Sequence, residues 1–208
     1  MKIITLILII LVCAFTGCKQ QKVSAKELVS NAIDSASIGN YKASERLLSA
    51  AIGRDPWLKK GFYLRGKVRI QLGDYKLALT NLEKAVNLMS NGSGYIFQKK
   101  NVFESGDDFW EVDYYDLIYQ KGVAYVYLDS LAQAYGCFRY LINTEFKEKS
   151  SCYLWKGEIM LAAGDSVKAC AEFINAKATA RDSSDRILAE NYLKHCQDKV
   201  NQDTFLLC

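Results

Sequence analysis

A short turn phrase recurs four times in this chain, and its spacing constrains the fold more than any other feature. The copies begin at Gly39, Gly73, Asp129 and Gly164, and each lies between two stretches with helical periodicity. Gly39 and Gly73 are 34 residues apart, and Asp129 and Gly164 are 35 apart. A period of this length is typical of two-helix units that stack and bury a common core. The sequence therefore predicts an all-α fold, an α-solenoid of about four helical hairpins.

Composition agrees with this fold class and excludes others. The chain has one proline in 208 residues, which favours helices and argues against a turn-rich β architecture. Its net charge of +4 is small, and the basic residues form no stripe, so we expect no nucleic-acid partner. The first hairpin is expected at Glu27 to Ile38 and Lys42 to Gly53, closed by Asp55-Pro56.

The clearest repeat is the second, where small, aromatic and alanine positions recur at helical spacing: Phe62, Gly66, Ile70, Leu72, Gly73, Tyr75, Ala78, Leu82 and Ala85. These positions resemble the tetratricopeptide repeat (TPR) family, and the resemblance covers about residues 25–178 apart from one insert. Repeat one departs from the family pattern with Leu28 and Ala32, and repeat three has Asp129 in place of the turn glycine.

A final helix is expected after the fourth repeat. Ser183-Ser184-Asp185 is a helix-start signal, and an apolar stripe follows it, formed by Ile187, Leu188, Tyr192 and Leu193. A stack of repeats needs a capping element at its end, so we expect this stripe to cover the last hairpin. The helical domain is predicted over residues 25–201, with residues 202–208 as a C-terminal tail.

The amino terminus predicts export and lipidation. Lys2 precedes an apolar run from Ile3 to Phe15 that is shorter than a bilayer span, which favours a cleaved signal over residues 1–17. Phe15-Thr16-Gly17-Cys18 resembles a bacterial lipobox, which implies acylation of Cys18 and a tether over residues 18–24. The alternative is an ordinary signal peptide that ends near a cysteine. We expect a lipid-anchored protein of the bacterial cell envelope, at the outer membrane because no aspartate follows Cys18, with the periplasmic or surface side left open.

The resemblance also implies a concave surface lined by the first helix of each unit. Carried over to this chain, that surface contains Lys26, Val29, Lys60, Tyr63, Lys67, Tyr119, Val123, Tyr127, Leu154 and Glu158. Tyrosine and lysine would suit a peptide with some acidic character. The alternative is that these tyrosines simply pack within the fold. The clamp that some relatives use for chaperone tail carboxylates is not expected, because Val29 and Ile33 replace its polar residues.

An insert over residues 93–114 interrupts the period between repeats two and three. Its aromatic and acidic side chains include Phe103, Asp107, Asp108, Phe109 and Trp110. The insert is interpreted either as a loop that packs on the neighbouring hairpins or as a recognition loop for a partner. Aromatic and acidic groups together also suit a small ligand such as a glycan fragment.

The cysteines suggest two disulfides. Cys137 and Cys152 are expected on helices that touch, as are Cys170 and Cys196. In an oxidising compartment either pair can form a disulfide, and the alternative is a pair of buried thiols. No CxxC motif is present and His195 is the single histidine, so we expect no metal site and no cofactor.

Enzymatic activity has no sequence support. The chain shows no Ser-His-Asp or Cys-His arrangement and no phosphate-binding glycine loop, so no small-molecule substrate is expected. The sequence predicts an adaptor or assembly factor that binds an envelope protein or peptide. The alternatives are a ligand-binding lipoprotein that uses the insert, and a structural subunit of a larger complex.

Overall fold

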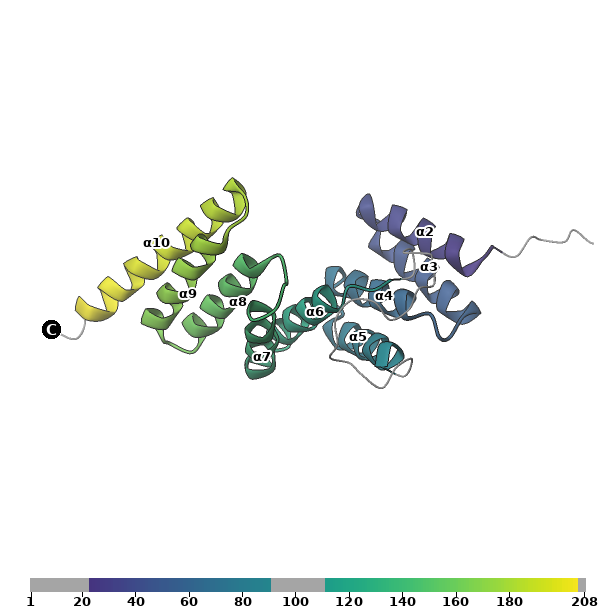
Figure 1. Ribbon diagram of the computed structural model, residues 1–208, viewed down its shortest axis with the longest axis horizontal. Helices are drawn as coiled ribbons and strands as arrows, with labels where there is room; N and C mark the ends of the chain where they lie inside the picture. Colours follow the sequence, from purple (N-terminus) through teal and green to yellow (C-terminus); the bar gives the residue numbers. More distant parts are fainter. Residues whose placement is uncertain (1–22, 91–110, 206–208) are drawn as a thin grey trace, which may run out of the picture.

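The structure is a computed structural model that describes residues 23–90 and 111–205, with side chains described as far as residue 200. Those residues form an elongated array of helices that follow one another in chain order, from α2 at one end to α10 at the other (Figure 1). The helices are α2 (Ala25–Ser37), α3 (Tyr41–Arg54), α4 (Lys59–Gln71), α5 (Tyr75–Ser90), α6 (Tyr114–Tyr127), α7 (Leu131–Ile142), α8 (Lys149–Ala162), α9 (Ser166–Thr179) and α10 (Ser183–Phe205). The predicted all-α solenoid of four hairpins and a capping helix is confirmed.

The four recurrent turn phrases join the two helices of each hairpin. Gly39, Gly73 and Gly164 adopt the left-handed conformation, with φ angles of 77°, 81° and 79°. This conformation ends a helix by returning backbone N–H groups to its last carbonyls, as in the 2.8 Å bond from the Asn40 amide to the Ser35 carbonyl. Asp129 adopts the same conformation with φ of 55°, so the turn survives the loss of its glycine.

Within each of the last three hairpins, a glycine on the first helix lets the second helix approach closely. A Cβ placed on Gly66 would clash with Leu82, one on Gly122 with Phe138 and one on Gly157 with Phe173. All three partner side chains are fully buried. The recurrence of glycine in the sequence pattern therefore reflects a steric requirement at the centre of each hairpin.

Several helix starts carry side-chain caps, two of which begin the first and third hairpins. Ser24 accepts a hydrogen bond from the Glu27 amide at 3.1 Å at the start of α2. Asp113 accepts bonds from the Tyr115 and Asp116 amides at 2.9 and 3.2 Å, and α6 begins at the next residue. Asp113 and Tyr114 are the last two residues of the predicted insert, so the start of α6 coincides with its predicted end.

The register of the capping helix differs from the prediction. The face of α10 that packs on the last hairpin contains Ala189 and Cys196, which are fully buried, with Tyr192 and Leu193 beside them. Ile187 and Leu188 point away from the hairpin and are 57% and 46% exposed, so assigning them to the covering stripe was wrong. The helix continues to Phe205, past the predicted domain end at residue 201.

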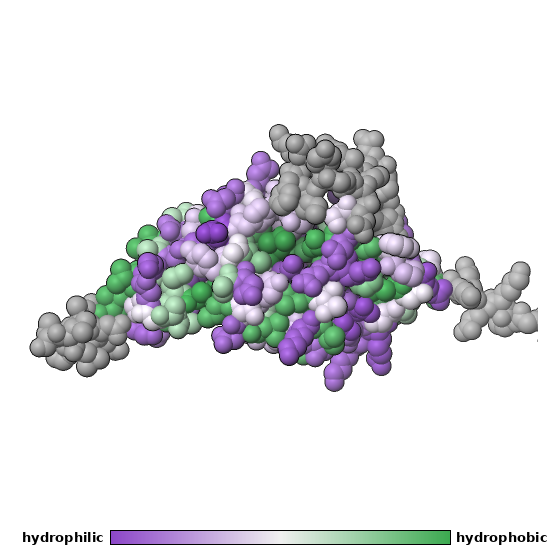
Figure 2. All heavy atoms as spheres, turned by 90° about the horizontal axis from the view of Figure 1, so that it is seen from below, coloured by the Kyte–Doolittle hydropathy of each residue, from purple (hydrophilic) through white to green (hydrophobic). Residues whose placement is uncertain are grey.

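Apolar side chains also reach the surface in separate patches among polar ones (Figure 2). Within residues 23–90 and 111–205, no helix combines the length and apolar character needed to cross a membrane.

Candidate functional site

The first helices of the hairpins lie side by side along the array. α4 contacts α6 and α8 contacts α10, in addition to the contacts between helices adjacent in sequence. α4 therefore lies beside α6, and α8 lies beside α10. The candidate site lies on these helices, and the predicted residues differ in whether they are exposed there.

Three aliphatic residues that were predicted for this surface belong to the core instead. Val29, Val123 and Leu154 are buried and join the apolar clusters between helices. They are β-branched or aliphatic, and the helices that carry them tilt these side chains into the stack. Interpreting them as an accessible wall was wrong, because helical spacing alone does not give the rotation of each helix about its axis.

Asp116 is the centre of a polar cluster that joins α4 to α6. Its carboxylate accepts hydrogen bonds from the Tyr63 hydroxyl, from the Lys67 ammonium at 3.1 Å and from the Gln120 amide at 3.1 Å. Tyr63 is 7% exposed, and its burial, its hydrogen bond to Asp116 and the nearby negative charge all raise the pKa of its hydroxyl. Tyr63 is therefore a buried linking residue, while the ammonium of Lys67 remains at the surface of the cluster.

Lys60 extends the same connection between repeats two and three. Its ammonium donates a 2.9 Å hydrogen bond to the Glu111 carbonyl, just before α6. Burial is the main cause that lowers the pKa of Lys60, and the charge of Glu111 acts in the opposite direction. Lys26 lies at the exposed start of α2. Two of the three predicted lysines thus also hold the array together.

Aromatic side chains connect the first helices of repeats three and four. Trp155 donates a 3.1 Å hydrogen bond from its indole nitrogen to the Tyr119 hydroxyl. Its ring also meets Tyr127, with centroids 6.2 Å apart and an edge-on geometry. Tyr119 is largely enclosed by Phe138 and Phe146, and burial raises the pKa of its hydroxyl. Packing is thus the main role of Tyr119, whereas Tyr127 is open to solvent.

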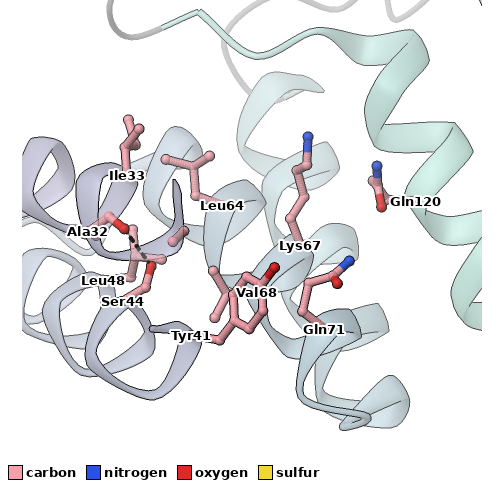
Figure 3. A pocket seen from close by; sticks show the side chains of 11 residues that line it. Ala32, Ile33, Tyr41, Ser44, Leu48, Leu64, Lys67, Val68, Gln71 and Gln120 are labelled. Carbon is pink, nitrogen blue, oxygen red and sulfur yellow. Dashed lines mark hydrogen bonds between the residues drawn. The ribbon is translucent and has the colours of Figure 1, made fainter. Parts of the chain in front are cut away.

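A pocket of about 310 Å³ opens between α2, α3, α4 and α6 (Figure 3). Its floor is apolar and formed by small or aliphatic side chains, because Ala32 and Ser44 leave room where α2 crosses α3. The Ser44 hydroxyl is satisfied by a 2.7 Å hydrogen bond to the Ala32 carbonyl. Ile33 stands at one side of the opening, with Lys67 and Gln120 at the other. The lining residues are Ala32, Ile33, Ala36, Tyr41, Ser44, Leu48, Leu64, Lys67, Val68, Gln71 and Gln120.

The pocket combines apolar side chains with polar groups, which suits a ligand that has an apolar side chain joined to a polar backbone. Ile33 and Leu64 offer apolar contact, while Gln71 and Gln120 carry amides that both donate and accept hydrogen bonds. Of its lining residues, only Lys67 was predicted as a site residue. Ile33 lies one helical turn after Val29, and Gln120 directly follows Tyr119. Their positions next to predicted residues could therefore have identified them as candidates. The missing information was the empty volume left by Ala32, Ala36 and Ser44.

One of the two disulfides considered from the sequence is present. Cys170 of α9 is bonded to Cys196 of α10, with Cα atoms 5.6 Å apart, and ties the capping helix to the last hairpin. Cys137 and Cys152 are free thiols. Burial raises the pKa of both, and that of Cys152 to about 12, so neither thiol is activated for nucleophilic chemistry at neutral pH.

The remaining predictions concern other parts of the chain. Phe103, Asp107, Asp108, Phe109 and Trp110 of the insert lie outside the described residues, as does Cys18 of the lipobox. Glu158 of α8 lies near Tyr192 of α10, where burial is the main cause and Glu158 the next that raises the pKa of the Tyr192 hydroxyl. His195 is exposed on α10. Among the described side chains, no group of three or more His, Cys, Asp or Glu residues is arranged to hold a metal ion.

Comparisons with known proteins establish the fold. No protein-family model matches the sequence, and no curated protein matches it. Among solved structures, the chain is similar to MamA (residue 41 to the end) from Desulfovibrio magneticus RS-1, with a TM-score of 0.61 and 18% identity over 79% of this chain and 80% of that one. The fold is a tetratricopeptide-type α-solenoid.

Two further structures support the same conclusion. YrrB, described as a TPR protein with an unusual peptide-binding site, gives a TM-score of 0.55 and 17% identity over 88% of this chain and 90% of that one. A chain of the APC/C hetero-tetramer Cut9–Hcn1 gives 0.65 and 14% identity, covering 83% of this chain but 30% of that one. The present chain therefore corresponds to the whole of a short array or to one segment of a longer one.

Proposed function

We propose that this protein is a membrane-anchored adaptor or assembly factor that binds a peptide segment of an envelope protein. The observation that carries the proposal is the pocket between α2 and α4, with an apolar floor and a rim of amide and ammonium groups. Its volume of about 310 Å³ accommodates one large apolar side chain. The mechanism proposed is binding, without chemical turnover.

The pocket lies on the face formed by the first helices, where a peptide can lie across several hairpins. An apolar side chain would enter between Ile33 and Leu64 and contact Val68 at the floor. The peptide backbone would meet the amides of Gln71 and Gln120 at the rim. An apolar anchor with flanking backbone hydrogen bonds is a common mode of peptide recognition. YrrB, which has the same fold, supports a peptide as the class of ligand.

The membrane location is part of the proposal and rests on the sequence. Cys18 within Phe15-Thr16-Gly17-Cys18 would carry the acyl chains, and the short tether to Ala25 would hold the array near its membrane. Mass spectrometry of the mature protein tests this directly. An acylated Cys18 as the first residue is expected, and an unmodified amino terminus or retention of residues 1–17 would contradict the anchor.

The binding proposal is tested by purifying the full lipidated protein in detergent from its native membrane and identifying what accompanies it. Ile33→Asp places a charge at the mouth of the pocket, where the isoleucine is 40% exposed. The matched control is Ile174→Asp on α9, which makes the same change at a side chain that is 53% exposed and lies outside the pocket. Both variants should keep the helical content and melting temperature of the wild type.

A partner bound by the wild type and the Ile174→Asp variant but lost with Ile33→Asp is the expected result. Retention of the same partner by Ile33→Asp would refute the pocket as the binding site. Loss of the partner with both variants would show an effect of added negative charge on the molecule as a whole, which would equally contradict the proposal.

A further inference from the structure

A tryptophan is presented to solvent by the tight turn that joins α3 to α4. Trp57 is 72% exposed. Two hydrogen bonds hold the turn: the Leu58 amide donates to the Asp55 carbonyl at 3.1 Å, and the Trp57 amide donates to the Asp55 carboxylate at 2.9 Å. Pro56 occupies the second position of the turn, where its restricted φ angle is favourable. Leu58 is 5% exposed and packs in the apolar cluster of the first hairpin, so the next residue along the turn is held inward while the indole stays outside.

This turn lies close to the start of α2, where the predicted lipid tether joins the array. α2 and α3 run antiparallel because a tight turn joins them, so the end of α3 returns to the beginning of α2 (Figure 1). Val23, just before α2, packs against the apolar cluster that contains Leu58. The tether over residues 18–24 spans at most about 25 Å when fully extended. Acyl chains on Cys18 would therefore keep Trp57 close to the membrane surface.

Basic side chains surround this tryptophan. The Lys84 ammonium of α5 lies over the Trp57 ring, 6.0 Å from its centroid. Arg54, which ends α3, and Lys59, which begins α4, flank the turn in sequence. Asp55 is the single acidic residue in that stretch of sequence. An exposed indole among cations suits a membrane surface, because indole rings are favoured at the level of the lipid headgroups and Lys and Arg are attracted to anionic lipids.

We propose that the turn of residues 55–58 docks on the bilayer that holds the protein, with Trp57 among the lipid headgroups and Lys84 beside anionic lipid phosphates. The inference rests on the proposed function, because it assumes that Cys18 carries the anchor. It adds an orientation, since an acyl anchor alone leaves the array free to turn above the membrane. The pocket is lined from α2, α3, α4 and α6 and by no residue of this turn or of α5, so docking through the turn leaves the pocket open to a peptide.

A protein partner is the other surface that an exposed tryptophan fits. Two observations favour the lipid surface. The tether joins the array next to this turn, and the side chains around the indole are cations rather than the apolar groups that surround an aromatic anchor in a protein interface.

Quenching of tryptophan fluorescence by brominated lipids tests the docking. The full lipidated protein is reconstituted into vesicles of equal parts phosphatidylethanolamine and phosphatidylglycerol, with bromine on the acyl chains either near the headgroup or near the chain end. Such lipids quench only an indole in contact with the bilayer. We expect stronger quenching with bromine near the headgroup, and Trp57→Phe should abolish most of it. Trp155→Phe, which replaces a partly buried indole on α8, should leave the lipid-dependent loss of emission unchanged.

Two lysines of α5 give a matched test of the charge contribution. Lys84 lies beside Trp57, whereas Lys76 is exposed on the same helix about 12 Å toward its other end. Lys84→Gln should lower the ratio of docked to undocked turn, measured from the quenched fraction, about fivefold, the effect of one cation beside an anionic surface. Lys76→Gln removes the same charge and should leave the ratio unchanged. Equal effects of the two variants would overturn the proposed contact.

The docking and the proposed function fail separately. An acylated protein whose Trp57 is not quenched by either lipid would overturn the docking, and loss of the membrane partner with Trp57→Ala in that case would assign the turn to a protein contact instead. The adaptor function stands in both cases if Ile33→Asp loses the partner. An unmodified Cys18 in mass spectrometry would refute the anchor and the docking with it. Retention of the partner by Ile33→Asp would refute the pocket, whatever the result with brominated lipids.

Discussion

The contact between Gly157 and Phe173 provides a quantitative test of how the hairpins are packed. A Cβ at Gly157 would lie 2.6 Å from Cζ and 2.7 Å from Cδ1 of Phe173, and closer still to Cε1. Phe173 is fully buried in the apolar cluster between α8, α9 and α10. Gly157→Ala therefore forces either the ring or the helix to shift.

The expected magnitude follows from two opposing effects. Alanine is favoured over glycine inside a helix by about 1 kcal/mol. Overpacking a filled core costs about 1–3 kcal/mol, and the deep overlap here belongs at the upper end of that range. Gly157→Ala should therefore lower the free energy of unfolding by about 1–2 kcal/mol. In a domain of this size that corresponds to a decrease of about 3–6 °C in the melting temperature.

Gly136→Ala is the matched control. Gly136 also lies inside a helix, α7, but a Cβ there meets nothing within 4 Å. This variant should gain the helix propensity without the clash and melt about 2–4 °C higher than the wild type. Thermal and urea unfolding followed by circular dichroism measure both variants. A melting temperature for Gly157→Ala equal to that of Gly136→Ala would refute the packing argument. A Phe173→Leu background should reduce the cost of Gly157→Ala, because the smaller side chain makes room for the methyl group.

Three further predictions concern a turn, the disulfide and a buried tyrosine. Asp129→Gly should raise stability by about 0.5–1 kcal/mol because Asp129 has a φ angle of 55°, whereas Gly73→Ala, at 81°, should lower it by a similar amount. Urea unfolding measures both changes, and a loss of stability in Asp129→Gly would contradict the turn geometry. Cys170→Ser removes the disulfide to Cys196 and should lower the free energy of unfolding by about 3 kcal/mol, with faster hydrogen exchange confined to α9 and α10. Unchanged exchange in α10 would show that packing alone holds the capping helix. Burial and Asp116 raise the pKa of Tyr63, so the folded state holds the hydroxyl proton more tightly and its stability should fall as pH rises above about 10. Tyr63→Phe should be less stable at neutral pH but lose less stability at alkaline pH. An unchanged pH dependence of stability in this variant would count against the buried Tyr63–Asp116 hydrogen bond.

Sequence periodicity predicted the repeats because their determinants are local. A glycine or a tolerated aspartate at each turn, and a small residue where two helices cross, recur at a fixed spacing whatever the surrounding sequence. Asp129 shows that the position rather than the residue type carried the information, since it adopts the same conformation as Gly39, Gly73 and Gly164.

The wrong predictions concern features that depend on the rotation of a helix about its axis or on empty volume between helices. In α10, apolar residues occupy two faces, and only the fit of Ala189 and Cys196 against α9 selects the buried one. Val29 and Val123 were assigned to the right helices but face the interior. The pocket depends on small side chains from α2 and α3 that are distant in sequence from Lys67, so no local pattern announces it.

The covalent bond between α9 and α10 gives the array a direction of unfolding. In a linear stack each hairpin is held only by its neighbours, so the ends open first. The carboxyl end is fastened by the covalent bond between Cys170 and Cys196. The described contacts that hold the first hairpin, α2 and α3, are non-covalent: packing, hydrogen bonds and the ion pair between Glu45 and Arg69. Fraying should therefore begin at α2 and proceed toward α10. That order would open the pocket, which α2 helps to form, before any other part of the face, so loss of the apolar site would precede loss of the fold.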